Sequence, residues 1–478
     1  MDSILFWNEV ALEANRVAHT NGVDGGTRGP TRSARTLAMV HLAMYDAYVS
    51  AKGSGTSYLQ NLPSAPNNAS IDAAISGAAH WMLSNLHTSQ ITTFNTAKSK
   101  ADFDYGIGGP AFVPSFNHGA VIAQALFLDR SSDPTASDAG YNPPTNRSAH
   151  HPDPCNPQQG YYGPFIGTSK CFAVSKRHAL DAPPAITSKE YRDALKIVRG
   201  KGIAPELAGT VPTGYPRRTE DETVMGIYWG YDGAKQLGTP PRLYNLIVRE
   251  LAKAKNNTIE ENARLFALVN VAMADAGILA WEQKYLHNLL RPVVGIREYD
   301  KSLGAIIQTP GGAVNVSTMP NNNLVNECDV NWLPLGAPNS NNNGAKNFTP
   351  PFPAYPSGHA TFGAAAFHIT RQFYGVKGRG PDTLFDGLSF VSEEFDGKST
   401  DNQGTVRPRH ERNFPGGLWK MIEENGFSRV YLGVHWHFDA FALDASNVPD
   451  YSKNIGGVPL GLNIAEDIMT TGMTKSIV

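Results

Sequence analysis

Two cationic side chains stand seven residues apart at the end of a long apolar segment. Lys284 and Arg291 flank the sequence YLHNLL, and Pro292 follows directly. Seven residues make about two helical turns, so both side chains are expected on one helix face with only ~20° of drift between them. Because proline disfavours helical backbone at the preceding residue, the helix is expected to stop at Arg291. Two cations near a helix end suit an anion, although a solvated basic face has the same pattern.

A proline-stiffened segment, PPFPAYPSGH at positions 350–359, leads into a second apolar helix. Ser357 is a natural N-cap. The free amides of the first turn, beginning with Gly358, can bind an oxyanion through their N–H groups and the helix dipole. His359 stands at the mouth of this helix, where an imidazole is well placed for acid–base work. An ordinary capped helix is the alternative interpretation.

A third motif, SRVYLGVHWHFD, ends at Asp439. Gly433 is expected to break the chain between Arg429 and His435. Beyond this break, His435 and Asp439 are spaced i,i+4 on a helix, so that the carboxylate can orient the imidazole. A strand would instead place His435, His437 and Asp439 on one face, as in zinc hydrolases, but the alanine-rich residues that follow favour a helix.

Together the three motifs describe a cage for one tetrahedral, multiply charged oxyanion. They supply three cations, a helix N-terminus with a hydroxyl group, and two histidines. Charge-assisted hydrogen bonds from such groups bind phosphate or vanadate firmly. One histidine could bond the central atom of the anion while the other moves protons.

The elements that must position these motifs are mostly helical. Apolar residues recur at helical spacing, and few segments alternate with the period of two that is typical of strands. Helices are expected at 5–19, 33–50, 71–86, 118–128, 189–198, 243–252, 259–290, 357–374, 418–427 and 460–473. Three stretches rich in Gly, Pro and polar residues, 129–184, 309–353 and 396–416, are expected to be long ordered loops that wall a site.

The composition excludes several classes of protein. The chain has 478 residues, with 41 Lys and Arg against 43 Asp and Glu, which excludes a generally basic nucleic-acid binder. Its 41% of hydrophobic residues excludes global disorder. The longest apolar run, 265–281, contains Asn270 and Asp275, so we expect a buried core helix and no membrane span.

Neither the N-terminus nor the cysteines indicate the cellular compartment of the protein. The N-terminus has neither a basic region nor an apolar stretch, so no ordinary signal peptide is expected. We expect a soluble protein, either extracellular or cytoplasmic. Cys155, Cys171 and Cys328 are too few for a disulfide framework, and a bridge between the first two stays open.

The sequence resembles the type-2 phosphatidic-acid-phosphatase superfamily. The motifs Lys-x6-Arg-Pro, Pro-Ser-Gly-His and Ser-Arg-x5-His-x3-Asp follow one another in the order of that superfamily. Within it, the surroundings are most similar to the fungal-type vanadium chloroperoxidases, a likeness carried by residues 4–8, 229–233, 238–242, 350–363 and 455–461. This resemblance implies an all-α fold of two four-helix bundles with long ordered loops. We expect an N-terminal bundle over 1–215 and a C-terminal bundle over 216–478 that carries the site.

The resemblance also implies a role for each candidate residue. Vanadate, the cofactor, would have its oxygens bound by Lys284, Arg291, Ser357, Gly358 and Arg429. His435 would bond vanadium, with Asp439 as its partner, and His359 would transfer protons. Asp232 would be the acidic partner of Arg429, although a lone Asp in a Tyr-Asp-Gly sequence is also typical of a turn.

The expected activity is the oxidation of chloride or bromide by hydrogen peroxide to hypohalous acid, which halogenates a small organic acceptor. Lys284 would polarise the peroxide. Phe352, five residues before the motif serine, has the residue type of the chloroperoxidases, where algal bromoperoxidases tend to have His. The alternative is a soluble acid phosphatase with a phospho-His intermediate on His435. The sequence does not predict the oligomeric state.

Overall fold

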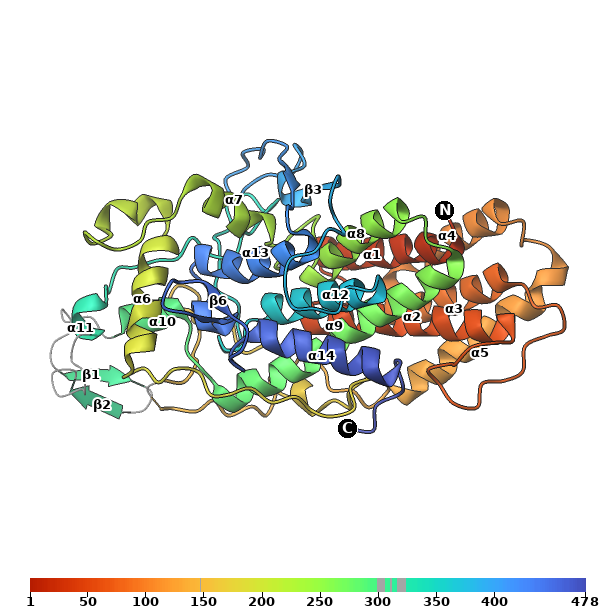
Figure 1. The fold of residues 1–478 in the computed structure, drawn as a ribbon, viewed down its shortest axis with the longest axis horizontal. Helices are drawn as coiled ribbons and strands as arrows, with labels where there is room; N and C mark the ends of the chain where they lie inside the picture. Colours follow the sequence, from red (N-terminus) through yellow and green to blue (C-terminus); the bar gives the residue numbers. More distant parts are fainter. Residues whose placement is uncertain (147, 299–305, 310–311, 316–323) are drawn as a thin grey trace.

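The computed structural model describes residues 1–146, 148–298, 306–309, 312–315 and 324–478, and it is mostly helical, as predicted (Figure 1). The helices are α1 (Ser3–Asn21), α2 (Pro30–Lys52), α3 (Ile71–Leu86), α4 (Ile91–Asp104), α5 (Val113–Asp129), α6 (Lys189–Lys201), α7 (Glu220–Tyr228), α8 (Pro240–Ala254), α9 (Ile259–His287), α10 (Pro292–Arg297), α11 (Leu324–Glu327), α12 (Gly358–Phe373), α13 (Gly417–Tyr431) and α14 (Gly457–Thr471). The strands form antiparallel pairs, β1 (Ile306–Thr309) with β2 (Gly312–Asn315), β3 (Ser389–Val391) with β4 (Glu411–Asn413), and β5 (Ala442–Leu443) with β6 (Pro449–Asp450).

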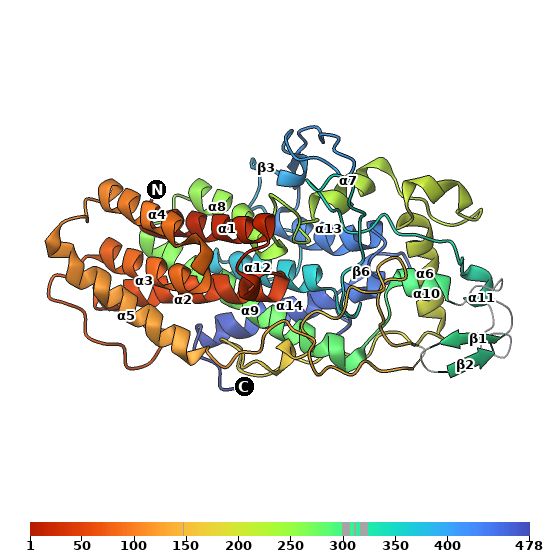
Figure 2. The ribbon, with the colours of Figure 1, turned by 180° about the vertical axis from the view of Figure 1, so that it is seen from behind.

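The helices are arranged along an elongated molecule. Helices α1 to α5 gather at one end, and α6, α7, α10 and α11 lie toward the other (Figures 1 and 2). Between them lie α8, α9, α12, α13 and α14, the helices that carry or adjoin the three motifs. The predicted division into bundles over 1–215 and 216–478 stays a prediction, because α9 packs both against α2 and against α12.

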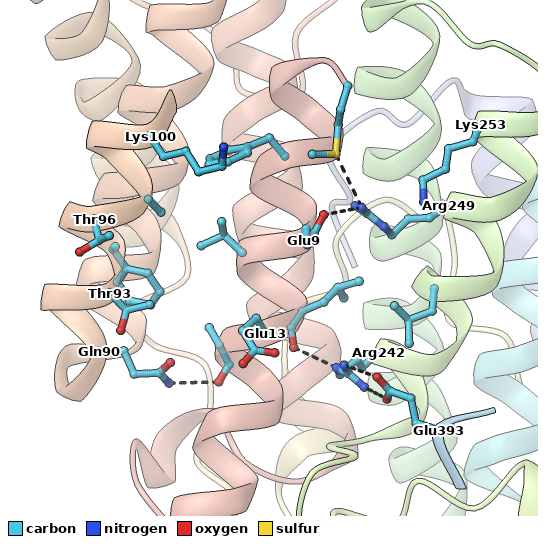
Figure 3. A pocket seen from close by; sticks show the side chains of 18 of the residues that line it. Glu9, Glu13, Gln90, Thr93, Thr96, Lys100, Arg242, Arg249, Lys253 and Glu393 are labelled. Atoms are coloured by element: carbon cyan, nitrogen blue, oxygen red, sulfur yellow. Dashed lines mark hydrogen bonds and ion pairs between the residues drawn. The ribbon is translucent and has the colours of Figure 1, made fainter. Parts of the chain in front are cut away.

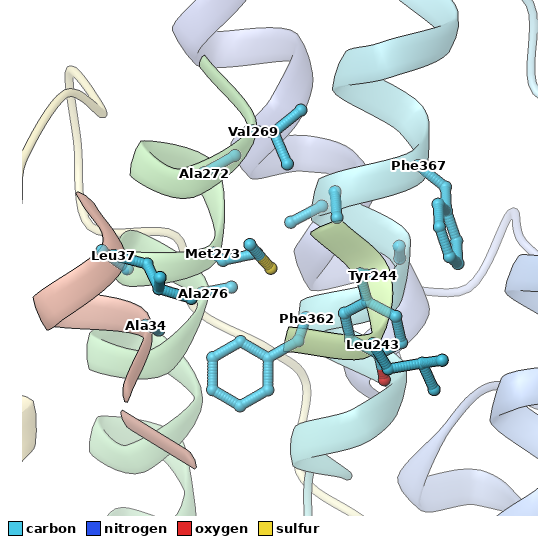
Figure 4. Close-up of a cluster of buried hydrophobic side chains, with 14 of the residues drawn as sticks. Ala34, Leu37, Leu243, Tyr244, Val269, Ala272, Met273, Ala276, Phe362 and Phe367 are labelled. Carbon is cyan, nitrogen blue, oxygen red and sulfur yellow. The ribbon is translucent and has the colours of Figure 1, made fainter. Parts of the chain in front are cut away.

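Helix α9 is the central element of the core. Its side chains Ala272, Met273 and Ala276 face α2 on one side and the aromatic residues of α12 and α8 on the other (Figure 4). Small residues on α9 let its neighbours approach closely, which increases the apolar area that each helix buries. Phe362 of α12 packs directly on Gly277, where a Cβ atom would lie 3.2 Å from its ring.

Among the residues that the structure describes, two helices are long and apolar enough to span a membrane by length and composition alone, Pro110–Asp129 and Ile259–His287. In the second, 94% of the apolar window is buried inside the protein, against 33% in the first. The prediction of a buried core helix over 265–281 is therefore confirmed.

Local sequence signals explain which helices of the structure were predicted and which were not. Helix α3 has the predicted bounds, and the Ser70 side chain caps it by accepting from the Ala73 amide. The segment 91–104 was not predicted because α4 is largely exposed and buries only Phe94 and Ala101. Helix α7 was also not predicted from the periodicity of apolar residues, although its capping box, Thr219 with Glu222, is visible in the sequence.

The predicted loops are largely irregular, with short elements inside them. The first, 129–184, contains one turn of 3-10 helix. The second, 309–353, contains β2 and α11, and its residues 310–311 and 316–323 lie outside the described residues. The third, 396–416, contains β4. Cys155 and Cys171 are not joined by a disulfide, so the possible bridge between them is not formed.

Candidate active site

His435 is held by Asp439, as the spacing predicts, but no α-helix connects them. The imidazole Nδ1 lies 2.7 Å from Asp439 Oδ2, which also accepts the Trp436 amide at 3.0 Å. The predicted helix through 435–445 is wrong: a single 3-10 turn, His437–Asp439, is followed by strand β5. Because Asp439 binds Nδ1–H, the lone pair of His435 is on Nε2. Burial raises the pKa of the Asp439 carboxyl to about 7, although Lys284 and Arg291 oppose this shift.

The zinc-hydrolase interpretation has no support in the structure. His437 Nδ1 faces the Phe441 carbonyl oxygen at 3.5 Å. Across the residues that the structure describes, no group of three His, Cys, Asp or Glu side chains is arranged to hold a metal ion.

Lys284 and Arg291 reach the site from different backbone segments, so the prediction of one shared helix face is wrong. Helix α9 ends at His287 because Asn288 adopts left-handed backbone, with φ 48°. The chain then runs extended, and Arg291 becomes the residue that precedes α10. The guanidinium donates to the carbonyls of Phe352 (2.9 Å) and Val434 (2.8 Å), and its Nη1 lies 2.8 Å from His435 Nε2.

The Lys284 amine is fully buried and surrounded by carbonyl oxygens. It donates to Pro353 at 2.8 Å, to Ala354 at 3.0 Å, and to Pro356. Burial, followed by the charge of Arg291, lowers the pKa of Lys284 well below its ordinary value. An ammonium group has three N–H donors, whereas a neutral amine has two. The three carbonyl oxygens around Lys284 Nζ therefore stabilise its charged form.

The N-terminus of α12 adjoins the His435 segment. The Ser357 amide donates to the Asp439 carbonyl at 2.7 Å, and its hydroxyl caps the helix by accepting from the Ala360 amide. Gly358 packs against Trp281, whose ring atoms would lie 3.2–3.3 Å from a Cβ atom there. The absence of a side chain therefore keeps the free amides of α12 close to the indole.

His359 has a defined tautomer and is neutral. Its Nε2 lies 2.7 Å from the Gly230 carbonyl, which can only accept, so the proton is on Nε2 and the lone pair on Nδ1. Burial, followed by the positive charge of Arg429, lowers the pKa of His359 to about 3. The imidazole is therefore uncharged at neutral pH, with the Nδ1 lone pair available to accept a proton.

Asp232 forms a buried pair with Arg429. The two guanidinium nitrogens donate to the two carboxylate oxygens at 2.7 and 2.9 Å. Asp232 belongs to the turn 230–232, in which Tyr231 has a φ of 51°, so the predicted turn and the predicted contact are both present. The same turn provides the Gly230 carbonyl that binds His359.

These groups surround a cavity of about 160 Å³. Six of the predicted site residues line it: Asp232, Phe352, Gly358, His359, Arg429 and His435. The other four adjoin the lining residues. Arg291 hydrogen-bonds to Phe352 and His435, and Asp439 hydrogen-bonds to His435. Lys284 contacts the Phe352 ring, and Ser357 directly precedes Gly358 in the chain. Phe352 is packed against both cations, with its ring centre 5.1 Å from Lys284 Nζ and 4.9 Å from Arg291 Cζ.

Several lining residues were not predicted. They are Gly29, Pro30, Tyr162, Thr239, Pro240, Trp281, Phe348, Pro350, Pro351 and Phe362. Trp281 lies one helical turn before Lys284, which is a signal that the sequence contained. Tyr162 comes from the loop 129–184, which was predicted to wall a site, although no signal in the sequence singles out this residue.

The charges of this site are not balanced. Three cations, Lys284, Arg291 and Arg429, meet two carboxyl groups, Asp232 and Asp439. Among the described residues, Arg291 Nη2 and Arg429 Nε are buried and have no hydrogen-bond partner. A buried donor without a partner costs ~1–3 kcal/mol. A tetrahedral oxyanion such as vanadate supplies both the acceptor oxygens and the missing negative charge, so these residues fit that group.

A larger cavity of about 810 Å³ lies between α1, α4 and α8, and it differs in its electrostatics (Figure 3). Its arginines are paired with carboxylates of its own wall, Arg249 with Glu9 and Arg242 with Glu393, each at 2.9 Å. It therefore lacks the excess of positive charge that distinguishes the smaller cavity.

Comparisons with known proteins agree with this geometry. Residues 1–160 match the family model of the vanadium chloroperoxidase N-terminal domain, and residues 264–445 match that of the second helical-bundle domain of vanadium chloroperoxidase (VCPO). The vanadium chloroperoxidase of Curvularia inaequalis is 34% identical over 582 aligned positions, which cover 98% of this chain and 90% of that protein.

Solved structures have the same fold. A bacterial vanadium-dependent iodoperoxidase superposes with a TM-score of 0.65 at 18% identity, covering 97% of this chain and 96% of that one. A holo-type bacterial vanadium-dependent chloroperoxidase superposes with a TM-score of 0.62 at 14% identity, covering 95% of each chain. With the full-length relative at 34% identity, these findings confirm the predicted resemblance, and the chain belongs to the vanadium chloroperoxidase family.

Proposed function

We propose that this protein is a vanadate-dependent haloperoxidase that oxidises chloride and bromide with hydrogen peroxide to hypohalous acid. The observation that carries the proposal is the pair of unpartnered guanidinium N–H groups on Arg291 and Arg429, in a buried site whose other wall contains a neutral histidine. Family membership supports the cofactor, the peroxide and the halide.

The proposed vanadate site uses groups from all three motifs. Arg291, Arg429 and Lys284 would bind the oxygens together with the Ser357 hydroxyl and the Gly358 amide, and His435 Nε2 would bond the metal. Lys284 would redirect one of its three N–H groups from a carbonyl to the cofactor. When bound, vanadate supplies Lewis-acid activation of peroxide without changing its oxidation state.

His359 is the proposed acid–base group. Because Nε2–H is held by the Gly230 carbonyl, Nδ1 is the atom that would accept a proton from hydrogen peroxide. A bound anion raises the pKa of a neighbouring imidazole, so His359 would retain that proton long enough to return it to the leaving oxygen. The fixed charges of Arg291 and Arg429 need little reorganisation when charge moves in this step.

The proposed halide pocket lies at Phe352. Its ring covers Lys284 and Arg291, so a halide beside Phe352 would meet positive charge through an apolar and largely dry wall. A desolvated halide is a stronger nucleophile than a hydrated one, which favours attack on the activated oxygen. The hypohalous acid formed there would halogenate a small organic acceptor.

The test is a vanadate titration of protein purified without vanadium, assayed for peroxide-dependent bromination and chlorination of a β-diketone. We expect both rates to rise in proportion to bound vanadium and to saturate at one vanadium per chain. Aryl-phosphate hydrolysis is measured on the same preparation. Phosphate hydrolysis without vanadate-dependent halide oxidation would show that the site is a phosphatase and would overturn the proposal.

A further inference from the structure

Tyr162 is the one phenol among the residues that line the proposed oxidation cavity. None of those lining residues is a methionine or a cysteine, the residue types that hypohalous acids oxidise most readily. Most of the wall is glycine, proline and phenylalanine, which such oxidants attack poorly. The ring centre of Tyr162 lies 6.0 Å from that of Phe352 and 6.0 Å from that of Trp281.

Tyr162 is held in this position at three points. Its amide donates to the Pro351 carbonyl at 2.7 Å, and its carbonyl accepts from the Tyr285 hydroxyl at 2.7 Å. Its own hydroxyl lies 2.9 Å from Thr31 Oγ1. The ring therefore stays at the cavity wall instead of swinging into solvent.

One edge of the Tyr162 ring is covered by backbone. Gly29 packs on the Cε2 edge, where a Cβ atom would lie 2.5 Å from Cε2, so the opposite ortho carbon, Cε1, is the candidate. Trp281, whose indole also lines the cavity, is 1% exposed and is covered by Gly163, Gly358 and Phe352. Tyr162 is only half-buried.

We propose that Tyr162 is a self-halogenation site, modified by the hypohalous acid that forms beside it when no organic acceptor is present. The proposal rests on the proposed function, which supplies the oxidant. In the step, Cε1 attacks the halogen, the new carbon–halogen bond forms as the halogen–oxygen bond breaks, and the ring proton leaves with the hydroxide as water. One C–H and one O–X bond are exchanged for one C–X and one O–H bond.

Tyr161 is a matched internal control for this reaction. It is adjacent in sequence and also half-buried, but its ring packs against Tyr141 at 5.1 Å and against His150 at 5.7 Å, and it does not line the cavity. Burial raises the pKa of both phenols, that of Tyr162 to about 12, so both are protonated at neutral pH. A difference in halogenation between them therefore reports where the oxidant forms.

The experiment incubates vanadate-loaded protein with bromide and hydrogen peroxide, without an organic acceptor, and locates bromine by peptide fragmentation and mass spectrometry. We expect bromine at Tyr162 to exceed that at Tyr161 by at least ~10-fold, because the oxidant is generated in contact with the ring. Hypobromous acid added to vanadate-free protein should mark the two residues about equally. An excess of a β-diketone should protect Tyr162 from bromination by consuming the hypobromous acid. The Tyr162→Phe variant should lose the preferential label, whereas the Tyr161→Phe variant should keep it.

The possible results distinguish a failure of the proposed modification site from a failure of the proposed function. Equal bromine on Tyr161 and Tyr162 in protein that oxidises bromide would overturn the modification site and leave the proposed function intact. Protein that oxidises no bromide overturns the proposed function, and the modification site falls with it. The decisive comparison, between bromine on Tyr162 and bromine on Tyr161, is made in wild-type protein. The result therefore does not depend on how well either variant folds.

Discussion

Nε2 of His435 and Nη1 of Arg291 lie 2.8 Å apart at one end of the cavity, although 144 positions separate the two residues. The carboxylate of Asp439 fixes the imidazole from its other side. The lone pair that would bond vanadium is therefore occupied by a guanidinium donor in this structure. Binding of the oxyanion exchanges this N–H···N contact for N–H···O contacts to the anion, which are stronger because the acceptor is charged.

Replacement of Asp439 should weaken vanadate binding without removing the metal ligand. In Asp439→Asn the imidazole loses the charged acceptor that orients it, and changes of this kind typically cost ~10–100-fold in metal affinity. His435→Ala should bind still less vanadate. The measurement is equilibrium dialysis with vanadium quantification, and Asp444→Asn on the exposed β5–β6 turn is the control. Unchanged affinity in Asp439→Asn would contradict the proposed role of His435.

Asp232→Asn should destabilise the vanadate-free protein strongly. Asp232 and Arg429 are 7% and 1% exposed, and removing one partner of a buried pair typically costs ~3–5 kcal/mol. Glu411→Gln, which breaks the exposed pair of Arg409 and Glu411, should stay within ~0.5 kcal/mol of wild type. Urea unfolding measures both. Added vanadate should recover part of the loss, because it supplies a new anion for Arg429.

Vanadate itself should stabilise the folded protein. A ligand present at 100 times its Kd adds about 2.7 kcal/mol to the free energy of unfolding. The effect should appear as a higher melting temperature, and excess phosphate should reduce the increase by competing for the same cations. In Arg429→Ala the increase should be small. An equal increase in wild type and Arg429→Ala would place the anion elsewhere.

His41 should make a defined contribution to acid sensitivity. Burial lowers its pKa to about 4, while the unfolded chain has an ordinary histidine near 6.5. Between these values the unfolded state binds the extra proton, so the contribution of His41 to stability is present above pH 6.5 and is lost as the pH falls toward 4. The advantage of wild type over His41→Gln should shrink by up to about 3 kcal/mol between pH 7 and pH 4.

The control for this measurement is His410→Gln, because His410 is exposed. Its free energy of unfolding should follow that of wild type at every pH in a series of urea titrations. A constant difference between wild type and His41→Gln across the series would show that His41 titrates normally in the folded state.

Sequence periodicity and caps determined most of the helices, because these signals act within a few residues. Helix α3 begins at the residue after its Ser70 cap, and α12 begins after its Ser357 cap, as the sequence indicates. Motif order also determined which residue types belong to the site and which family the chain resembles, and comparison with the Curvularia inaequalis enzyme confirms that family.

Tertiary structure decided how those residues meet. Lys284 and Arg291 were expected together on a helix face, yet the left-handed backbone at Asn288 ends α9, and contacts to distant carbonyls position both cations. Tyr162 is held at the cavity by hydrogen bonds of its backbone with Pro351 and Tyr285. Helix signals are local and can be read along the chain. A cavity instead forms from contacts between distant segments, such as Arg291 with Phe352, 61 residues apart, and Tyr162 with Tyr285, 123 residues apart.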